Sequence, residues 1–323
     1  MPAMRRTRCS TRRAIRLTPM TVAAARRLAL TDVSMRWFAA VLALWAAASV
    51  PAVAADEACV TAGCGQMPAG EWRGLAADSA AAVVRIPAWV TEIPDYAFAG
   101  CTALRRVEFA EGSRLRRVGR YAFLGCTSLD SLPLPPSVTE IGEGALRECE
   151  ALGAFTVPQG VTAIEPHTFE WCVSLRSVSL PPGLKKVGMS AFKYCRSLEA
   201  VTLPEGVAQV GMNAFSCCSS IVEIVFPSTV TELGSYVMSE CVSLRRAVLP
   251  ANGSLLGELM FSGCRSLVEI VELSPVPPAF DCGSFIFEPD EAELYRRCRL
   301  TLKSGTEARY RAAPGWRLFY GCK

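Results

Sequence analysis

Thiols dominate the chemistry that this chain could perform, because its cysteines are numerous and regularly spaced. The 323 residues include fifteen cysteines, and a thiol can act as a nucleophile, a metal ligand or a disulfide partner. Eight of them form a series in which the first step is 25 residues and each of the next six is 23 residues. These ladder cysteines are Cys101, Cys126, Cys149, Cys172, Cys195, Cys218, Cys241 and Cys264.

Other catalytic groups are sparse. The single histidine, His167, occupies a variable position of the repeat, so we interpret it as a surface residue rather than a catalytic base. No C-x-x-C occurs at zinc spacing, and no glycine-rich phosphate loop follows a strand. We therefore expect no catalytic residue, no metal site, no cofactor and no enzymatic activity. Several carboxylates vary from copy to copy and indicate a solvated face: Glu92, Glu140, Glu165 and Glu232.

A cysteine that recurs once per repeat is best explained as a small buried residue whose S–H group donates weakly to a carbonyl. Stacked neighbours come close enough for a disulfide, but parallel side chains do not provide the dihedral angle that an S–S bond needs. We expect the ladder cysteines to be free thiols. Bridges are expected among the others, first Cys298–Cys322 or Cys282–Cys298; the candidates are Cys59, Cys64, Cys217, Cys282, Cys298 and Cys322.

The repeat is clearest at 180–202, which reads LPPGLKKVGMSAFKYCRSLEAVT. Residues 203–225 and 226–248 follow the same template, L-P-x-x-V-x-x-I-G-x-x-A-F-x-x-C-x-S-L-x-x-V-x. A fixed period of this size is typical of a solenoid, in which neighbouring coils complete a core that one repeat cannot close alone. The phenylalanine column contains Phe98, Phe123, Leu146, Phe169, Phe192, Phe215, Met238 and Phe261.

Within each repeat, the L-x-x-V-x-L segment alternates as a half-buried strand does. Strands stacked at about 4.8 Å per coil predict one long parallel sheet on the concave side. The G-x-x-A-F segment is too short for a standard helix and predicts a single turn on the convex side. The expected fold class is therefore an α/β solenoid.

Three stretches carry a family resemblance: IGEGALRECEAL at 141–152, VGMSAFKYCRSL at 187–198 and VGMNAFSCCSSI at 210–221. They resemble the BspA-like leucine-rich repeat family with 23-residue units, a type also found in a treponemal leucine-rich repeat protein. The resemblance covers 86–271, and the tail at 300–319 is similar to the C-terminal end of the family. It implies a right-handed coil and, for bacterial members, attachment to host or matrix proteins or cell–cell contact.

The first 55 residues are expected to be a signal peptide. Residues 1–36 hold nine arginines and one acidic residue, and an apolar run of 14 residues follows at 37–50. The run is shorter than the roughly 20 residues that span a bilayer, so we expect no stable membrane span after signal removal, with an N-terminal anchor as the alternative. Met35 is the expected true start, and cleavage is expected near Ala54 or Ala55.

Charge argues against nucleic-acid binding. The whole chain has 34 basic and 30 acidic residues, but 56–323 has 25 basic and 29 acidic, a net charge of −4. The basic balance thus belongs to the targeting segment, and the mature chain has no electrostatic footprint for nucleic acid.

The remaining chain is expected to divide into an N-terminal cap at 56–85, about eight repeat coils at 86–271 and a C-terminal cap at 272–323. A bare solenoid end exposes apolar side chains, which is why caps are needed. SPVPP at 274–278 is a stop signal, because proline has no N–H to donate to a ladder. For the same reason Pro133, in a strand position, predicts an interruption of the sheet.

The outward positions of the last three repeat strands are rich in valine. Val225, Val248 and Val271 are expected to align in a row, with an apolar strip as the result. The strip is either an open contact site or core covered by the C-terminal cap. The candidate binding residues are Val222, Val225, Val248, Val268 and Val271, flanked by Glu223, Arg245, Arg246 and Glu269.

We interpret the chain as an exported binding protein, located in the periplasm, at the cell surface or in the medium. The expected partner is a protein, with host or matrix proteins as the form that the resemblance implies. A small hydrophobic or lipid-like ligand at the valine strip, or self-association of an envelope protein through it, are the alternatives. Fold alone does not decide among them.

Overall fold

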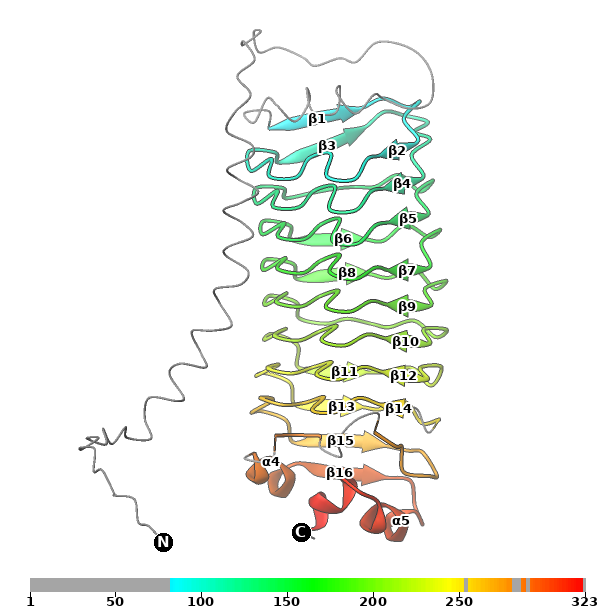
Figure 1. Ribbon diagram of the computed structural model, residues 1–323, viewed down its shortest axis with the longest axis vertical. Helices are drawn as coiled ribbons and strands as arrows, with labels where there is room; N and C mark the ends of the chain where they lie inside the picture. The colour runs from blue at the N-terminus through cyan, green and yellow to red at the C-terminus, as the bar shows by residue number, and fades with distance from the viewer. Residues whose placement is uncertain (1–81, 253–254, 281–285, 289–290, 322–323) are drawn as a thin grey trace, which may run out of the picture. The chain divides into compact units, whose positions relative to one another are not determined.

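The computed structural model describes residues 82–252, 255–280, 286–288 and 291–321 (Figure 1). The chain divides into two compact units, Met1–Glu57 and Ala58–Lys323, and all described residues belong to the second. The expected signal peptide, the start at Met35 and most of the expected N-terminal cap lie outside the described residues. Within the second unit the chain forms a solenoid of stacked coils, which confirms the predicted fold (Figure 1).

One face of most coils contributes a strand to what we call the first ladder, the parallel pairing predicted from L-x-x-V-x-L. Its strands alternate outward exposed and inward buried side chains, as in Ala154–Thr156. The strands are β1 (Val83–Ile86), β3 (Arg106–Phe109), β6 (Ala154–Thr156), β8 (Ser177–Ser179), β11 (Glu223–Val225), β13 (Arg246–Val248), β15 (Glu269–Glu272) and β16 (Arg299–Leu302).

The first ladder is broken where Pro133 predicted a break. Ser131 forms only an isolated bridge with Arg106, and no strand follows it through 134. The Leu134 N–H donates instead to the Leu132 carbonyl within its own coil, at 3.0 Å. A second break follows Ala200, which forms only a bridge with Ser177, and this one was not predicted.

A second ladder of two-residue strands runs along another side of the coils, as two sheets with a break between 140–141 and 163–164 (Figure 1). Its strands are the two residues x-I of the template segment x-I-G. The second residue of each pair points inward and is buried in every coil. Sequence analysis missed this ladder because two residues cannot display an alternating pattern. Its strands are β2 (Glu92–Ile93), β4 (Arg117–Val118), β5 (Glu140–Ile141), β7 (Ala163–Ile164), β9 (Lys186–Val187), β10 (Gln209–Val210), β12 (Glu232–Leu233) and β14 (Leu255–Leu256).

The repeat glycine follows this second ladder because consecutive coils approach closely there. A Cβ atom on Gly211 would lie 2.6 Å from the Met189 nitrogen and 2.8 Å from the Gly188 carbonyl carbon. The Gly211 N–H donates to the Val187 carbonyl of the previous coil at 2.8 Å. A side chain at this position would push the coils apart.

The predicted convex turn follows the glycine, and it is hydrogen bonded from coil to coil. In the turn at 166–171, the N–H groups of His167, Phe169 and Trp171 donate to carbonyls of the next coil at 2.8–2.9 Å. His167 and Trp171 both have a positive φ, 60° and 65°. Residues with a positive φ occur at the two equivalent positions of the other coils as well.

The core is the set of columns that the repeat predicted. Phe98 stacks on Phe123 with ring centroids 5.2 Å apart, and Phe169, Phe192 and Phe215 form a second stack with spacings of 5.1 and 5.2 Å. All five are fully buried. Offset aromatic pairs contribute roughly 0.5–1.5 kcal/mol beyond their burial, so the columns tie each coil to its neighbours.

The C-terminal segment first adds one more strand to the solenoid and then covers its end. Strand β16 pairs in parallel with β15 and adds a strand to the first ladder. The helices α4 (Ala292–Arg297) and α5 (Glu307–Ala312) and the 3-10 helix η1 (Trp316–Tyr320) pack around this end (Figure 1). The Trp316 indole is buried and donates to the Pro278 carbonyl at 3.1 Å, which holds the proline segment against η1.

Candidate functional site

The predicted valine row lies on β11, β13 and β15. Val225 pairs in register with Val248, and Val248 with Val271. Val222 and Val268 precede the outer two of these strands. Val222 and Val225 are each 49% exposed, Val268 is 41% exposed, and Val248 is half-buried. We call these four residues the valine strip.

Val271 does not belong to the exposed surface, which corrects the expectation that it faces outward with the others. It is 7% exposed, because β16 pairs alongside β15 and places Thr301 next to Val271. The strip is therefore open at Val222, Val225 and Val268, and the covering expected as the alternative applies to Val271 alone. Arg245, a predicted flanking residue that directly precedes β13, is exposed.

Charged side chains form a bordering network across the same strands. Arg246 forms ion pairs with Glu223 and with Glu269, the latter at 3.2 Å between Nε and Oε2. Thr301 and Arg299 donate to the other Glu269 oxygen at 2.8 and 2.6 Å. The Thr301 hydrogen bond, followed by that from Arg299, lowers the pKa of Glu269 below its usual value. The network favours the ionised form of the Glu269 carboxylate beside the strip.

The break at Pro133 opens a cavity of about 400 Å³ in the first ladder. On one side it is lined by 131–134 and Pro136, and on the other by 154–159, which includes β6. A second cavity of about 350 Å³ lies on the second ladder, with Met189 and Leu255 among its lining residues. Neither cavity is lined by a residue of the valine strip.

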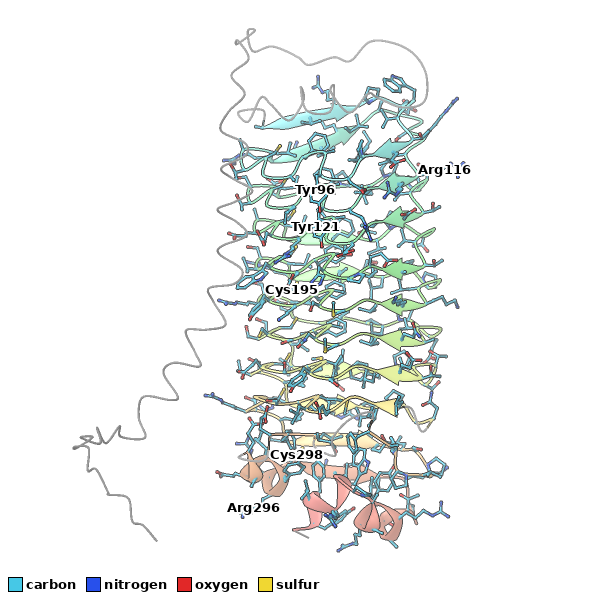
Figure 2. The ribbon with its side chains drawn as sticks, in the orientation of Figure 1. Tyr96, Arg116, Tyr121, Cys195, Arg296 and Cys298 are labelled. Carbon is cyan, nitrogen blue, oxygen red and sulfur yellow. The ribbon has the colours of Figure 1, made fainter. Side chains whose placement is uncertain are left out.

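Seven of the eight ladder cysteines have the predicted buried environment, and Cys101 is half-buried. All eight are free thiols, and Cys195 donates its S–H to the Phe169 carbonyl of the previous coil at 3.1 Å (Figure 2). Equivalent bonds extend from Cys126 to Cys264, with sulfur–oxygen distances of 3.0–3.3 Å. Burial raises the pKa of these thiols well above its usual value, as at Cys218. They are structural donors.

The predicted bridges of Cys298 are wrong. Cys298 is a free, buried thiol (Figure 2), and burial raises its pKa to about 12. Its expected partners, Cys282 and Cys322, lie outside the described residues, as do Cys59 and Cys64. Cys217 is also free, and it is half-buried.

The histidine belongs to a structural ion-pair cluster on the turns. His167 Nδ1 lies 3.0 Å from Glu170 Oε2, and Arg147 Nε lies 3.1 Å from the same oxygen. Neither a cysteine nor a serine completes a nucleophilic pair with it among the hydrogen bonds of the described residues. In the described part of the chain, no group of three or more His, Cys, Asp and Glu side chains is arranged to hold a metal ion.

Sequence reasoning also missed a charge network on the second ladder. Arg117 contacts Glu92, Asp95 and Glu140, which come from the coils before and after it. Both glutamates, Glu92 and Glu140, are expected from the sequence to belong to a solvated face. The signal was present in the repeat register, since the x of x-I is acidic, basic and acidic in three consecutive coils.

A scan against protein-family models matches the BspA type leucine rich repeat region, in six copies, over residues 78–199 and 162–276. A search of curated proteins finds no match. No helix in the described residues has the length and apolarity needed to cross a membrane.

Solved structures with a similar chain include a leucine rich cell surface protein from Faecalibacterium prausnitzii, at 23% identity over 71% of this chain and 81% of that one, with a TM-score of 0.36. The T. pallidum leucine rich repeat protein is 28% identical over 62% and 72%, with a TM-score of 0.32. The pneumococcal vaccine antigen PcpA is 18% identical over 71% and 65%, with a TM-score of 0.43.

Proposed function

This chain belongs to the BspA-type leucine-rich repeat family, and on that premise we propose that it is an exported protein that binds other proteins through the valine strip of its first ladder. The single observation that carries the proposal is the pairing of the exposed Val225 with the half-buried Val248 on neighbouring strands, with the exposed Val222 and Val268 just before β11 and β15 and an ion-pair network at the border. Solenoids offer such extended sheet faces as binding surfaces.

The strip and its border have complementary roles in this proposal. Covering the exposed part of Val222, Val225 and Val268 contributes about 1 kcal/mol per valine. Glu223 and Arg246 lie directly beside the apolar row, so a partner with charges in the matching positions binds in one register. The partner surface is therefore apolar at its centre and charged at its rim.

The finer parts of the proposal come from the sequence. The segment at 1–55 has the order of a signal peptide, which supports export to the periplasm, the cell surface or the medium. Attachment to host or matrix proteins is the specific form that the family resemblance implies. The proposal assigns no catalytic residue, metal or cofactor.

A protein partner is favoured over a small apolar ligand by the shape of the site. The two described cavities lie at the Pro133 break and on the second ladder, away from the valine strip. A small ligand needs a concave pocket that covers most of its surface, whereas a row of half-exposed valines suits a flat partner. Self-association through the strip uses the same chemistry with a second copy as partner.

Native mass spectrometry of residues 56–323 separates these candidates. The informative variant is Val225→Glu, and the matched control is Val83→Glu, since Val83 is 46% exposed at the other end of the same ladder. We expect the wild-type chain to be a monomer without bound lipid. When matrix proteins are added, it should form a complex that Val83→Glu retains and Val225→Glu loses.

Other results contradict the proposal in distinct ways. Extra mass that disappears in Val225→Glu identifies a small ligand instead. A dimer that disappears in the same variant identifies self-association. A protein complex that survives Val225→Glu places the binding surface elsewhere.

A further inference from the structure

The turns contain a second row of unusual residues, directly before the ladder cysteines. The residue at this position has a φ between 59° and 78° in all eight coils. Glycine adopts such a backbone at low cost and occupies three of the eight positions, whereas a bulky side chain there is a marked exception. Two consecutive coils nevertheless place aromatic residues in this position, Trp171 at 65° and Tyr194 at 64°.

The two aromatic rings stack and support two cations. The ring centroids of Trp171 and Tyr194 are 4.0 Å apart with an interplanar angle of 21°. The Arg196 guanidinium carbon lies 5.7 Å from the Trp171 ring and 5.8 Å from the Tyr194 ring. Lys193 Nζ lies 5.3 Å from the Tyr194 ring. We call these four residues the turn cluster.

The cations of the turn cluster form no ion pair among the described residues, in contrast to Arg117, Arg147 and Arg246. Arg196 is exposed, and its backbone is fixed from the next coil, where the Ser219 and Ser220 hydroxyls donate to its carbonyl at 3.2 and 2.7 Å. Its guanidinium donors are thus held beside two rings and remain available. Stacking on aromatic faces orients a guanidinium and leaves its planar edge free for a carboxylate.

We propose that the turn cluster binds a single carboxylate side chain of a protein partner. A carboxylate accepts two parallel hydrogen bonds from a guanidinium, and a nearby ammonium adds a third. The edges of Trp171 and Tyr194 then contact the apolar stem of that side chain, and Trp, Tyr and Arg are the residue types that dominate binding energy at interfaces. This site lies on the turns and does not depend on the valine strip.

A single carboxylate fits better than a polyanionic glycan because of the net charge of the chain. Residues 56–323 carry a net charge of −4, which opposes a chain of repeated anions. The acidic side chain that acts on Tyr194 is Glu170, and Arg147 and His167 already contact its carboxylate. A single partner carboxylate can therefore contact Lys193 and Arg196, whereas a polyanion would bring further negative charges to a negatively charged chain.

NMR titration of the full chain tests this inference, with the tripeptide N-acetyl-Ala-Glu-Ala-amide as the probe and its glutamine analogue as the comparison. The readouts are the side-chain N–H signals of Trp171 and Arg196. We expect a saturable shift with the glutamate peptide, at a Kd on the order of 1 mM, and at least tenfold weaker binding of the glutamine peptide.

Two variants and one control keep the result interpretable. Arg196→Gln should weaken binding at least tenfold, and Arg176→Gln, which removes an exposed arginine of the first ladder, should not change it. Trp171→Gly places at this position the residue found there in three other coils, so the variant should fold. Its affinity for the glutamate peptide should be at least threefold lower than that of the wild-type chain. No saturable shift, equal binding of both peptides, or unchanged binding by Arg196→Gln overturns the inference. Tighter binding of a sulfated heparin disaccharide than of the glutamate peptide overturns the choice of partner.

Discussion

Glu272 is the residue whose environment departs most from its type. It ends β15, is fully buried, and accepts a hydrogen bond from the Ser274 N–H at 2.7 Å. The buried Tyr310 hydroxyl of α5 donates to the Ser274 carbonyl at 3.0 Å. Burial raises the pKa of Glu272 to about 7 from 4.5. The C-terminal end of the first ladder therefore contains a carboxyl group whose protonated form is favoured by folding.

This shift gives a pH dependence of stability with a defined sign. Since the folded pKa lies above the unfolded one, the contribution is fully present below about pH 4.5 and is lost as the pH rises towards 7. A shift of this size corresponds to about 3 kcal/mol. We expect the free energy of unfolding, measured by urea denaturation from pH 4.5 to 8, to fall less steeply in Glu272→Gln than in the wild-type chain.

Glu269→Gln is the control, because the pKa of Glu269 is lowered and its contribution changes only below about pH 4.5. It should leave the slope between pH 5 and 8 unchanged. Equal slopes for Glu272→Gln and the wild-type chain would mean that the Glu272 carboxyl is solvated in the folded protein.

Adjacent thiols offer a second test at the residue scale. Cys218 is fully buried, donates to the Phe192 carbonyl at 3.1 Å and has a pKa well above its usual value because of burial. Cys217 is half-buried. Because the thiolate is the reactive form, we expect iodoacetamide to modify Cys217 at least ten times faster than Cys218 in the folded protein, as measured by peptide mass spectrometry. The two should react alike in urea, and equal rates without urea would contradict the ladder assignment.

At the scale of the element, the repeat glycine sets how closely two coils approach. A Cβ atom at Gly211 would collide with backbone atoms of the coil before, at 2.6–3.0 Å, whereas one at Gly153 would meet nothing within 4 Å. Overpacking of this kind costs about 1–3 kcal/mol. Gly211→Ala should therefore lower the free energy of unfolding by that amount, and Gly153→Ala should leave it unchanged or raise it. Equal effects would show that the coils separate freely at the second ladder.

The elements also show what the sequence could predict. The first ladder, the core columns and the break at Pro133 followed from a period repeated eight times and from a proline without an N–H. The second ladder did not, because a two-residue strand has no period of its own. The break after Ala200 has no proline at the corresponding strand position, and nothing in the repeat predicted it.

Single-copy segments were the hardest to predict. The proline run at 274–278 correctly indicated the end of the repeats, but β16 returns to the first ladder after it. Its pairing with β15 buries Val271, which the repeat pattern placed on the surface. The turn cluster was missed because its members occupy variable positions, and only the coil-to-coil stack brings Trp171 to Tyr194.

At the scale of the whole described solenoid, neighbouring coils contact each other through two interrupted ladders, a turn-to-turn hydrogen-bond series and stacked core columns. Stability in such a fold is approximately a sum of nearest-neighbour contributions. The rigid stack leaves function to the outward positions, which differ from coil to coil. On the first ladder, exposed valines lie at Val83 at the N-terminal end and in the valine strip towards the C-terminal coils.

The central claim is that the valine strip is the surface that contacts a protein partner, and site-specific photo-cross-linking tests it most directly. A photoreactive phenylalanine derivative placed at Val225 is compared with one at Val83, equally exposed on the same ladder, while the protein is bound to immobilised matrix proteins. The account predicts a cross-linked partner from Val225 and little or none from Val83. Cross-linking from Val83 alone, or equally from both, would contradict it.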